Sequence, residues 1–258
     1  MAPVLERQSQ QDDPREITAQ FYDRVLSVVA TTSVDRRFQA VADLVLEHAV
    51  RYLATTDAGI QLLVFQCLPS LVDDSTKTII TSLYVRLAIG TAPWRMQAHS
   101  SFPLHGAESL AGYAAKMVHP MVSQDIQRNP DHFPLRQEEH ARSTAAYPLL
   151  QECRVAGCFQ ILSRLPNYFS PDRLDMLRRY ADLLALAFHS HEFYDPQAIA
   201  LYLMPPTDVQ RPYLASFQQQ VHTALRSAKA RQQEMNVLLA ERQVLQEIEQ
   251  KLRTLQEK

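Results

Sequence analysis

The glycines of this 258-residue chain are few and all lie in its middle, which restricts where tight turns and strands can form. They are Gly59, Gly90, Gly106, Gly112 and Gly157. Glycine is used where φ must be positive or where two backbones approach closely, and it is costly inside helices. The distribution therefore predicts two helical ends around a central region of strands and turns, which is an α+β arrangement.

The N-terminal part carries two helical patterns. Asp13-Pro14-Arg15-Glu16 has the residue types of a capping box with proline at the first helical position, so a helix is predicted to start there, within residues 1–33. A second helix is predicted over residues 34–53, because apolar residues recur there with helical spacing. Its apolar stripe is Phe38, Val41, Val45, Ala49 and Tyr52.

The central part contains short runs of β-branched and aromatic residues separated by turn signals, which is typical of strands. The predicted strands cover residues 58–68, 78–89, 100–104, 121–122, 145–150 and 154–163. The last two are separated by only a few residues, so they are expected to form an antiparallel hairpin. Helices are predicted at 110–118 and after Ser170-Pro171-Asp172, where serine can cap the first turn.

From Pro212 to the last residue the sequence has no further proline and no glycine. Uninterrupted, this segment would form one helix of roughly 70 Å at about 1.5 Å per residue. Its apolar residues follow a heptad pattern with one discontinuity, which favours a parallel homodimer through a coiled coil. The expected dimer seam is Leu214, Phe217, Val221, Met235, Leu238, Leu245, Ile248 and Leu252. The alternative is that the segment folds back on its own domain.

The bulk composition excludes several classes of protein. A net charge of −2 gives no reason to expect a nucleic-acid or anionic-membrane partner. No apolar run approaches the ~20 residues that span a bilayer, and the N-terminus lacks the apolar stretch of a signal peptide. We therefore expect a soluble, cytoplasmic protein. The three cysteines, Cys67, Cys153 and Cys158, fit neither a disulfide framework nor a zinc site, and no metal ligands or catalytic set are predicted.

The order of elements after Phe102 resembles the C-terminal two-thirds of a GAF domain, a small-molecule sensor module of signalling proteins. The elements that carry the resemblance are Gly106 and Gly112 around a short helix, Pro120 to Asp125, Pro148, Gly157, and Phe169-Ser170. The resemblance covers residues 34–194. It implies a central antiparallel sheet with flanking helices and a ligand pocket between the sheet and the loops that join its middle strands.

This resemblance places Trp94, Tyr113, Asp125 and His132 near the ligand pocket, and Met117 lies in the same irregular region and is expected to add an apolar wall. The motifs of known subtypes are missing. The Asn-Lys-Phe-Asp-Glu signature of cyclic-nucleotide-binding members is incomplete, no cysteine is followed by histidine as in bilin-binding members, and the cysteines lack the glycine-rich context of free methionine sulfoxide reductases. The ligand and any cofactor therefore stay unidentified.

The sequence is interpreted as a sensor in which a GAF-like domain (34–194) binds a small ligand and a C-terminal helical segment (195–258) relays it to a signalling partner. Two alternatives remain. Ser190-His191-Glu192-Phe193 resembles the phosphoacceptor box of histidine kinases, so His191 is the candidate of a degenerate dimerisation scaffold. A small redox enzyme on the same fold is the other alternative.

Overall fold

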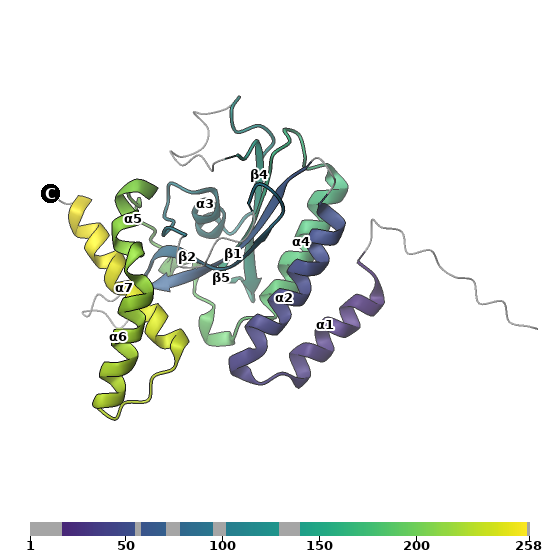
Figure 1. Cartoon of the computed structure of the whole chain (residues 1–258). Helices are drawn as coiled ribbons and strands as arrows, with labels where there is room; N and C mark the ends of the chain where they lie inside the picture. The colour runs from purple at the N-terminus through teal and green to yellow at the C-terminus, as the bar shows by residue number, and fades with distance from the viewer. Residues whose placement is uncertain (1–16, 55–57, 71–77, 95–101, 129–139, 257–258) are drawn as a thin grey trace, which may run out of the picture.

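The computed structural model describes residues 17–54, 58–70, 78–94, 102–128 and 140–256. Its centre is a five-stranded sheet in which every neighbouring pair is antiparallel, with the strand order β2-β1-β5-β4-β3 (Figure 1). The strands are β1 (Ile60–Pro69), β2 (Ile80–Gly90), β3 (Met121–Ser123), β4 (Ser143–Gln151) and β5 (Arg154–Ser163). The helices are α1 (Ala19–Thr31), α2 (Val34–Leu53), α3 (Leu110–Met117), α4 (Pro171–Ala185), α5 (Thr207–Ala215), α6 (Phe217–Ala230) and α7 (Val237–Gln256), with short 3-10 helices η3 (Ser190–Glu192) and η4 (Pro196–Ala198).

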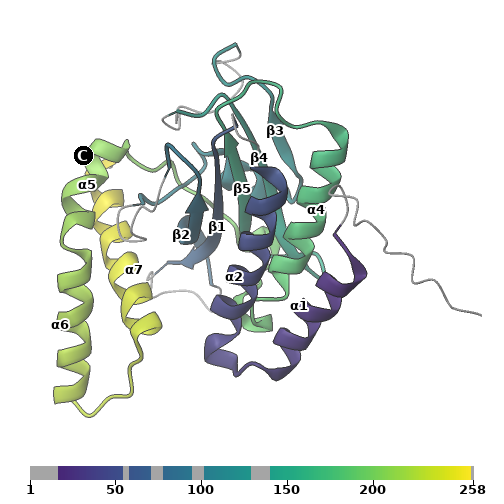
Figure 2. The same cartoon turned by 45° about the vertical axis from the view of Figure 1, so that its right-hand side comes forward.

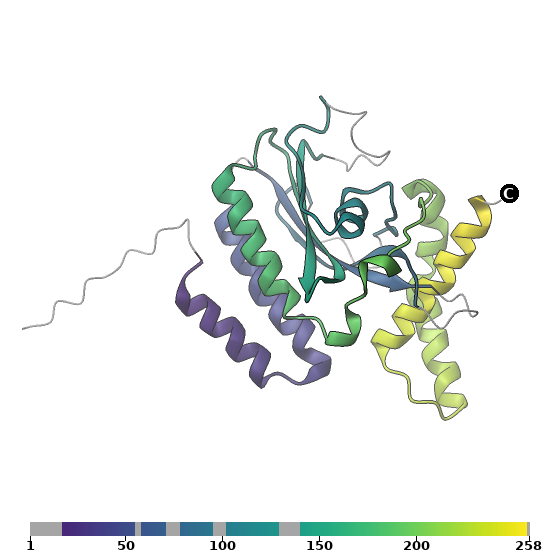
Figure 3. The ribbon, with the colours of Figure 1, turned by 180° about the vertical axis from the view of Figure 1, so that it is seen from behind.

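Helices cover both faces of the sheet. Helices α2 and α4 lie side by side on one face with α1 outside them, and α3 lies on the other face (Figures 1 and 3). Alternate residues of a strand point to opposite faces, so β1 contributes to two cores. Leu62 and Val64 belong to the core beneath α2 and α4, whereas Leu63 and Phe65 belong to the core beneath α3.

The central predictions from sequence are largely confirmed. Helix α2 has the predicted bounds, α3 ends one residue early, and the β4–β5 hairpin forms as expected. The strand predicted at 100–104 is wrong where it can be described, because residues 102–104 form no strand and the next residue, His105, makes only an isolated bridge to Leu83. The expected cap at Asp13 lies outside the described residues. Helix α1 begins at Ala19, and the Thr18 side chain caps it by accepting from the Phe21 backbone N–H.

The prediction of one long C-terminal helix is wrong, although the segment is helical. The chain bends at Ser216 and turns back at residues 231–236, where Gln232 has a positive φ of 57°. Helices α6 and α7 consequently pack against each other as an antiparallel pair, called here the C-terminal hairpin (residues 217–256; Figure 2). The hairpin also contacts the sheet, where α7 packs against β1, and helix α5, which touches both of its helices.

The physical reason is that the chain's own core supplies the apolar partner that the heptad stripe needs. Most of the predicted seam is buried in one cluster with Leu68 of β1 and Leu104. The buried seam residues are Leu214, Phe217, Val221, Leu245, Ile248 and Leu252. Met235 packs against this cluster, and Leu238 is exposed. In this structure the six residues pack within one chain, as the fold-back alternative predicts, and a dimer through the C-terminal segment stays a prediction.

The buried hairpin predicts unequal effects for two leucines that a coiled-coil seam would treat alike. Leu245 is 8% exposed and Leu238 is 48% exposed. Leu245→Lys should lower the free energy of unfolding by about 2–5 kcal/mol, because it removes core packing and introduces a charge. Leu238→Lys should change it by less than about 0.5 kcal/mol. Urea denaturation measures both values. Equal stability of the two variants, with a dimer-to-monomer change in sedimentation for each, would contradict the hairpin.

Helix α7 also buries a carboxyl group against the sheet. Glu249 is 1% exposed, and within the described residues its Oε1 atom and the hydroxyls of Thr81 and Ser82 lack hydrogen-bond partners of ordinary geometry. Burial raises the pKa of Glu249, which the two hydroxyls and Arg253 only partly oppose. A carboxyl group with a raised pKa in the folded state binds its proton more tightly there than in the unfolded state.

This shift predicts a pH-dependent stability. As pH rises from the ordinary glutamate pKa of about 4.3 through the raised value in the folded state, the charged carboxyl becomes costly to bury and the free energy of unfolding falls. Glu249→Gln should remove this loss, so its advantage over the wild type should grow with pH. Urea denaturation across this interval measures the two slopes. Glu247→Gln is the matched control, because Glu247 accepts a hydrogen bond from Gln243 on the same helix instead. Parallel curves for Glu249→Gln and the wild type would contradict the argument.

No helix in the described part of the chain is both long and apolar enough to cross a membrane.

Candidate functional site

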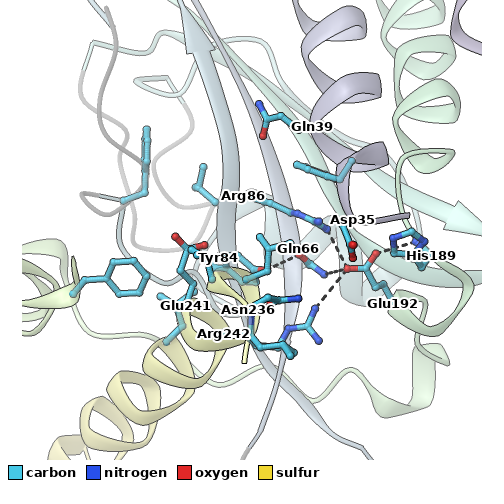
Figure 4. A pocket seen from close by; sticks show the side chains of 18 of the residues that line it. Asp35, Gln39, Gln66, Tyr84, Arg86, His189, Glu192, Asn236, Glu241 and Arg242 are labelled. Atoms are coloured by element: carbon cyan, nitrogen blue, oxygen red, sulfur yellow. Dashed lines mark hydrogen bonds and ion pairs between the residues drawn. The ribbon is translucent and has the colours of Figure 1, made fainter. Parts of the chain in front are cut away.

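A cavity of about 630 Å³ lies at the β2 edge of the sheet, between the sheet and the C-terminal hairpin. We call it the edge pocket. Four parts of the chain line it: the start of α2, strands β1 and β2, the short helix η3, and helices α5 to α7 (Figure 4). Its polar residues include Asp35, Gln39, Gln66, Tyr84, Arg86, His189, His191, Glu192, Asn236, Glu241 and Arg242, and its apolar residues include Phe38, Val85, Phe102, Leu214, Phe217, Leu238 and Leu245.

The polar centre of the edge pocket is the carboxylate of Glu192, which is 3% exposed. Its Oε1 atom accepts hydrogen bonds from Gln66 Nε2 at 2.8 Å and from Arg86 Nη1 at 3.1 Å. Its Oε2 atom accepts from the backbone N–H of His189 at 2.8 Å. Arg242 of α7 forms an ion pair with the same Oε1 atom at 3.5 Å. Figure 4 shows these side chains converging on Glu192 from the sheet and from the hairpin.

The pairing of β1 with β2 positions the two sheet residues that contact Glu192, which are Gln66 and Arg86. Gln66 pairs with Tyr84 across the strands, and the Tyr84 hydroxyl donates to the side-chain oxygen of Gln66. That bond leaves the Gln66 amide to face Glu192. Arg86 is the extra residue of a β-bulge in β2, between Val85, which pairs with Phe65, and Leu87, which pairs with Val64. Its guanidinium lies 3.5 Å from the ring centroid of Phe38, which places it between α2 and Glu192.

The surroundings keep the buried carboxylate of Glu192 ionised. Burial alone would raise its pKa, but Arg86, the His189 backbone N–H and Gln66 together lower it. The opposite holds for Glu241, whose pKa is raised by burial and only partly lowered by Arg86. The edge pocket thus holds one firmly charged carboxylate and one that burial disfavours in its charged form.

An apolar cavity with a few convergent polar groups is the usual form of a small-molecule site. The edge pocket combines apolar walls with many polar residues around Glu192, which makes it the candidate site for a small ligand. Within the described residues no group of three histidine, cysteine, aspartate or glutamate side chains could hold a metal ion.

Four ligand-binding residues predicted from the sequence fall within the described part of the chain, and none of them lines the edge pocket: Trp94, Tyr113, Met117 and Asp125. Trp94 is buried in the core beneath α3, and Tyr113 and Met117 are 40% and 54% exposed on α3. Asp125 forms an ion pair with Arg142 at 3.1 Å. His132 lies outside the described residues, as do the segments 95–101 and 129–139 on either side of this region. A pocket there stays a prediction.

The two alternative sites can also be located. His191 is an exposed residue of η3 that lines the edge pocket. Its ring stacks on that of His189, with the two ring centroids 5.5 Å apart. The neighbouring carboxylate that would act as its base belongs to Glu192 and is engaged by Arg86 and Gln66. Cys67 and Cys158 are buried, and burial raises the pKa of both thiols, which disfavours the reactive thiolate. Cys153 is exposed.

Sequence reasoning missed Arg86, Glu192 and Arg242 as members of one site. One signal was present: Arg86 interrupts a strand that is otherwise apolar on that stretch, and a charge within such a strand is usually paired. Arg242 gave no such signal, because its meeting with Glu192 depends on the chain turning back at 231–236.

Comparison with known proteins assigns the family. A family model described as GAF domain matches residues 35–189, which is more than half of the chain. The chain therefore belongs to the GAF domain family, whose members are sensor or regulatory modules. In a comparison with curated protein sequences, none matches the chain significantly.

Solved structures with a similar fold come from several kinds of protein. One is a type II free methionine-R-sulfoxide reductase from Thermoplasma acidophilum, with 16% identity and a TM-score of 0.46 over 63% of this chain and 99% of that one. Another is the GAF domain of an Acinetobacter phosphoenolpyruvate-protein phosphotransferase, with 14% identity and a TM-score of 0.45 over 68% and 96%. A third is the GAF domain of a Bacillus halodurans two-component sensor histidine kinase, with 15% identity and a TM-score of 0.40 over 58% and 91%.

The Glu192 centre predicts a non-additive pair of substitutions. Arg86→Met should lower the free energy of unfolding by about 3 kcal/mol, because it leaves a buried carboxylate short of its main cation. Adding Glu192→Gln should recover a large part of that loss, because the buried charge is then absent and the single amide oxygen can still accept from either Gln66 or the His189 N–H. A double-mutant cycle by urea denaturation measures the coupling. Additive effects of the two substitutions would show that the ion pair is not formed.

Proposed function

We propose that the protein is a signal-transduction sensor in which a small ligand binds in the edge pocket and the C-terminal hairpin relays the event. One observation supports this proposal above the others: the hairpin itself forms a wall of the pocket, through Phe217, Asn236, Leu238, Glu241, Arg242 and Leu245. A ligand in the pocket would touch the sensor domain and the hairpin together. Membership of the GAF domain family agrees with a sensor or regulatory role.

The relay follows from differential binding. A ligand shifts an equilibrium between two arrangements only as far as it binds one of them better. Here the two arrangements are the hairpin docked on the sheet and the hairpin displaced from it. The docked state is held by the apolar cluster around Leu245 and by polar contacts at the end of β1, where Gln246 Nε2 donates to the Pro69 carbonyl at 2.7 Å. A ligand that adds contacts to α7 strengthens docking, and one that competes with Arg242 for Glu192 weakens it.

The proposed partners are those that would read the position of the hairpin: a second copy of the chain or a downstream signalling protein. The start of α7 offers a surface for either, because Val237, Leu238 and Leu239 are consecutive and exposed. The relay through the edge pocket operates within one chain and does not depend on which partner reads it.

The relay predicts a ligand-dependent distance between the hairpin and the sensor domain. The distance can be measured by double electron–electron resonance between two spin labels in a Cys153→Ser background. One label is attached at Glu47→Cys on α2 and the other at Lys229→Cys at the hairpin tip. Both native residues are exposed. The ligands to test are the hits of a thermal-shift panel of nucleotides, tetrapyrroles, amino acids and organic acids, since a ligand at ~100 times its dissociation constant stabilises by ~2.7 kcal/mol.

A hit should change the 47–229 distance distribution and leave that of a control pair, Glu47→Cys with Lys116→Cys on α3, unchanged. A ligand that stabilises the protein without altering the 47–229 distribution would contradict the relay. Native mass spectrometry of protein purified from its host identifies a ligand that is retained during purification.

A further inference from the structure

Resting on the proposed function, we infer that the edge pocket binds a small organic carboxylate with an apolar body, and that its carboxylate pairs with Arg242. The inference names the chemical class of the ligand and the side chain that selects it. It depends on the arrangement of charge and apolar surface in the edge pocket.

One oxygen of the Glu192 carboxylate is shared among three partners. Its Oε1 atom serves Gln66, Arg86 and Arg242 at once, and Arg242 is the most distant of the three at 3.5 Å. A charge-assisted N–H···O bond is ordinarily about 2.7–2.9 Å long. Arg242 is therefore the least satisfied cation of the centre. Its guanidinium carries five N–H donors in a fork that matches a carboxylate, and its ion pair with Glu192 is made through Nη2.

Part of the edge-pocket lining at the start of α7 is apolar and exposed to water. Val237, Leu238 and Leu239 are each about half exposed, although all three line the pocket at the start of α7. Phe38 and Phe102 add aromatic side chains to the lining. Single exposed apolar residues are ordinary on a protein surface, whereas a contiguous apolar group beside a cavity is typical of a binding site. A ligand whose apolar body covers this group would remove it from water while its charged end reaches Arg242.

Two acidic residues also line the edge pocket, and they favour the opposite ligand, an amine. Asp35 is exposed in the first turn of α2, so its charge is screened by water. Glu241 is partly buried, and burial raises the pKa of its carboxyl group, an effect that Arg86 partly opposes. Both arginines, by contrast, keep their charge whatever their surroundings. Arg242, held by one ion pair of 3.5 Å, can offer its remaining donors to an anionic ligand at the polar end of the cavity.

The test compares three probes with the same chain length and different ends: octanoate, 1-octanol and octylamine. Isothermal titration calorimetry with the full chain near neutral pH should give octanoate about tenfold tighter binding than 1-octanol, which corresponds to about 1.4 kcal/mol. Arg242→Met should abolish this preference, and Arg242→Gln should do the same if the methionine variant folds poorly. Arg226→Met, an exposed arginine of α6, is the matched control and should keep the preference. Leu238→Ser should weaken octanoate and 1-octanol to the same degree.

Several results would overturn the inference: no octanoate binding, equal binding of octanoate and 1-octanol, tighter binding of octylamine, or a preference that survives both Arg242 variants. The spin-label pair separates this inference from the relay. Octanoate binding that depends on Arg242 without any change in the 47–229 distance would overturn the relay and leave the ligand class standing. A distance change caused by a neutral or cationic compound, with no carboxylate preference, would overturn the ligand class and leave the relay.

Discussion

The buried carboxylate of Glu192 is the contact on which the arrangement at the β2 edge of the sheet depends. It lies in η3, directly after the helix that covers the sheet, and it meets β1 through Gln66, β2 through Arg86 and the hairpin through Arg242. A buried charge is costly unless it is paired and hydrogen-bonded, so these elements must meet at one geometry for Glu192 to remain there. The ion pair thereby fixes where the chain leaves the sensor domain.

Arg86 shows how one side chain ties this polar centre to the apolar core. Its guanidinium donates to Glu192 and lies over the ring of Phe38. The Phe38 ring in turn contacts the ring of Phe188. A guanidinium is more weakly hydrated than an ammonium and stacks on aromatic rings, so arginine fits a site that is ionic on one side and aromatic on the other. Lysine would keep the charge at this position but would lose the planar stacking and the forked geometry.

The sequence predicted the sheet and its helices well because local signals were strong there. The apolar run of β1, the Ser170 cap of α4 and the stripe of α2 each had a match in the structure. The C-terminal hairpin could not be predicted in the same way. A heptad stripe indicates that a helix needs an apolar partner. It does not indicate whether Leu245 packs against a second chain or against the residues around Leu68. The edge pocket was missed for the same reason, because Arg242 reaches Glu192 only after the chain has turned back.

The contact between the hairpin and the sheet combines apolar burial that favours docking with a buried carboxyl group that opposes it. Such a balance suits an element that can move. Leu245, Ile248 and Leu252 bury apolar surface and favour docking. Glu249 lies among the same contacts and loses hydration without a full set of partners, which subtracts from that gain. A hairpin held by apolar contacts alone would dock more firmly and respond less to a ligand. Since a ligand can shift an equilibrium only by its differential affinity, a docked state weakened by a buried carboxyl group suits the relay that we propose.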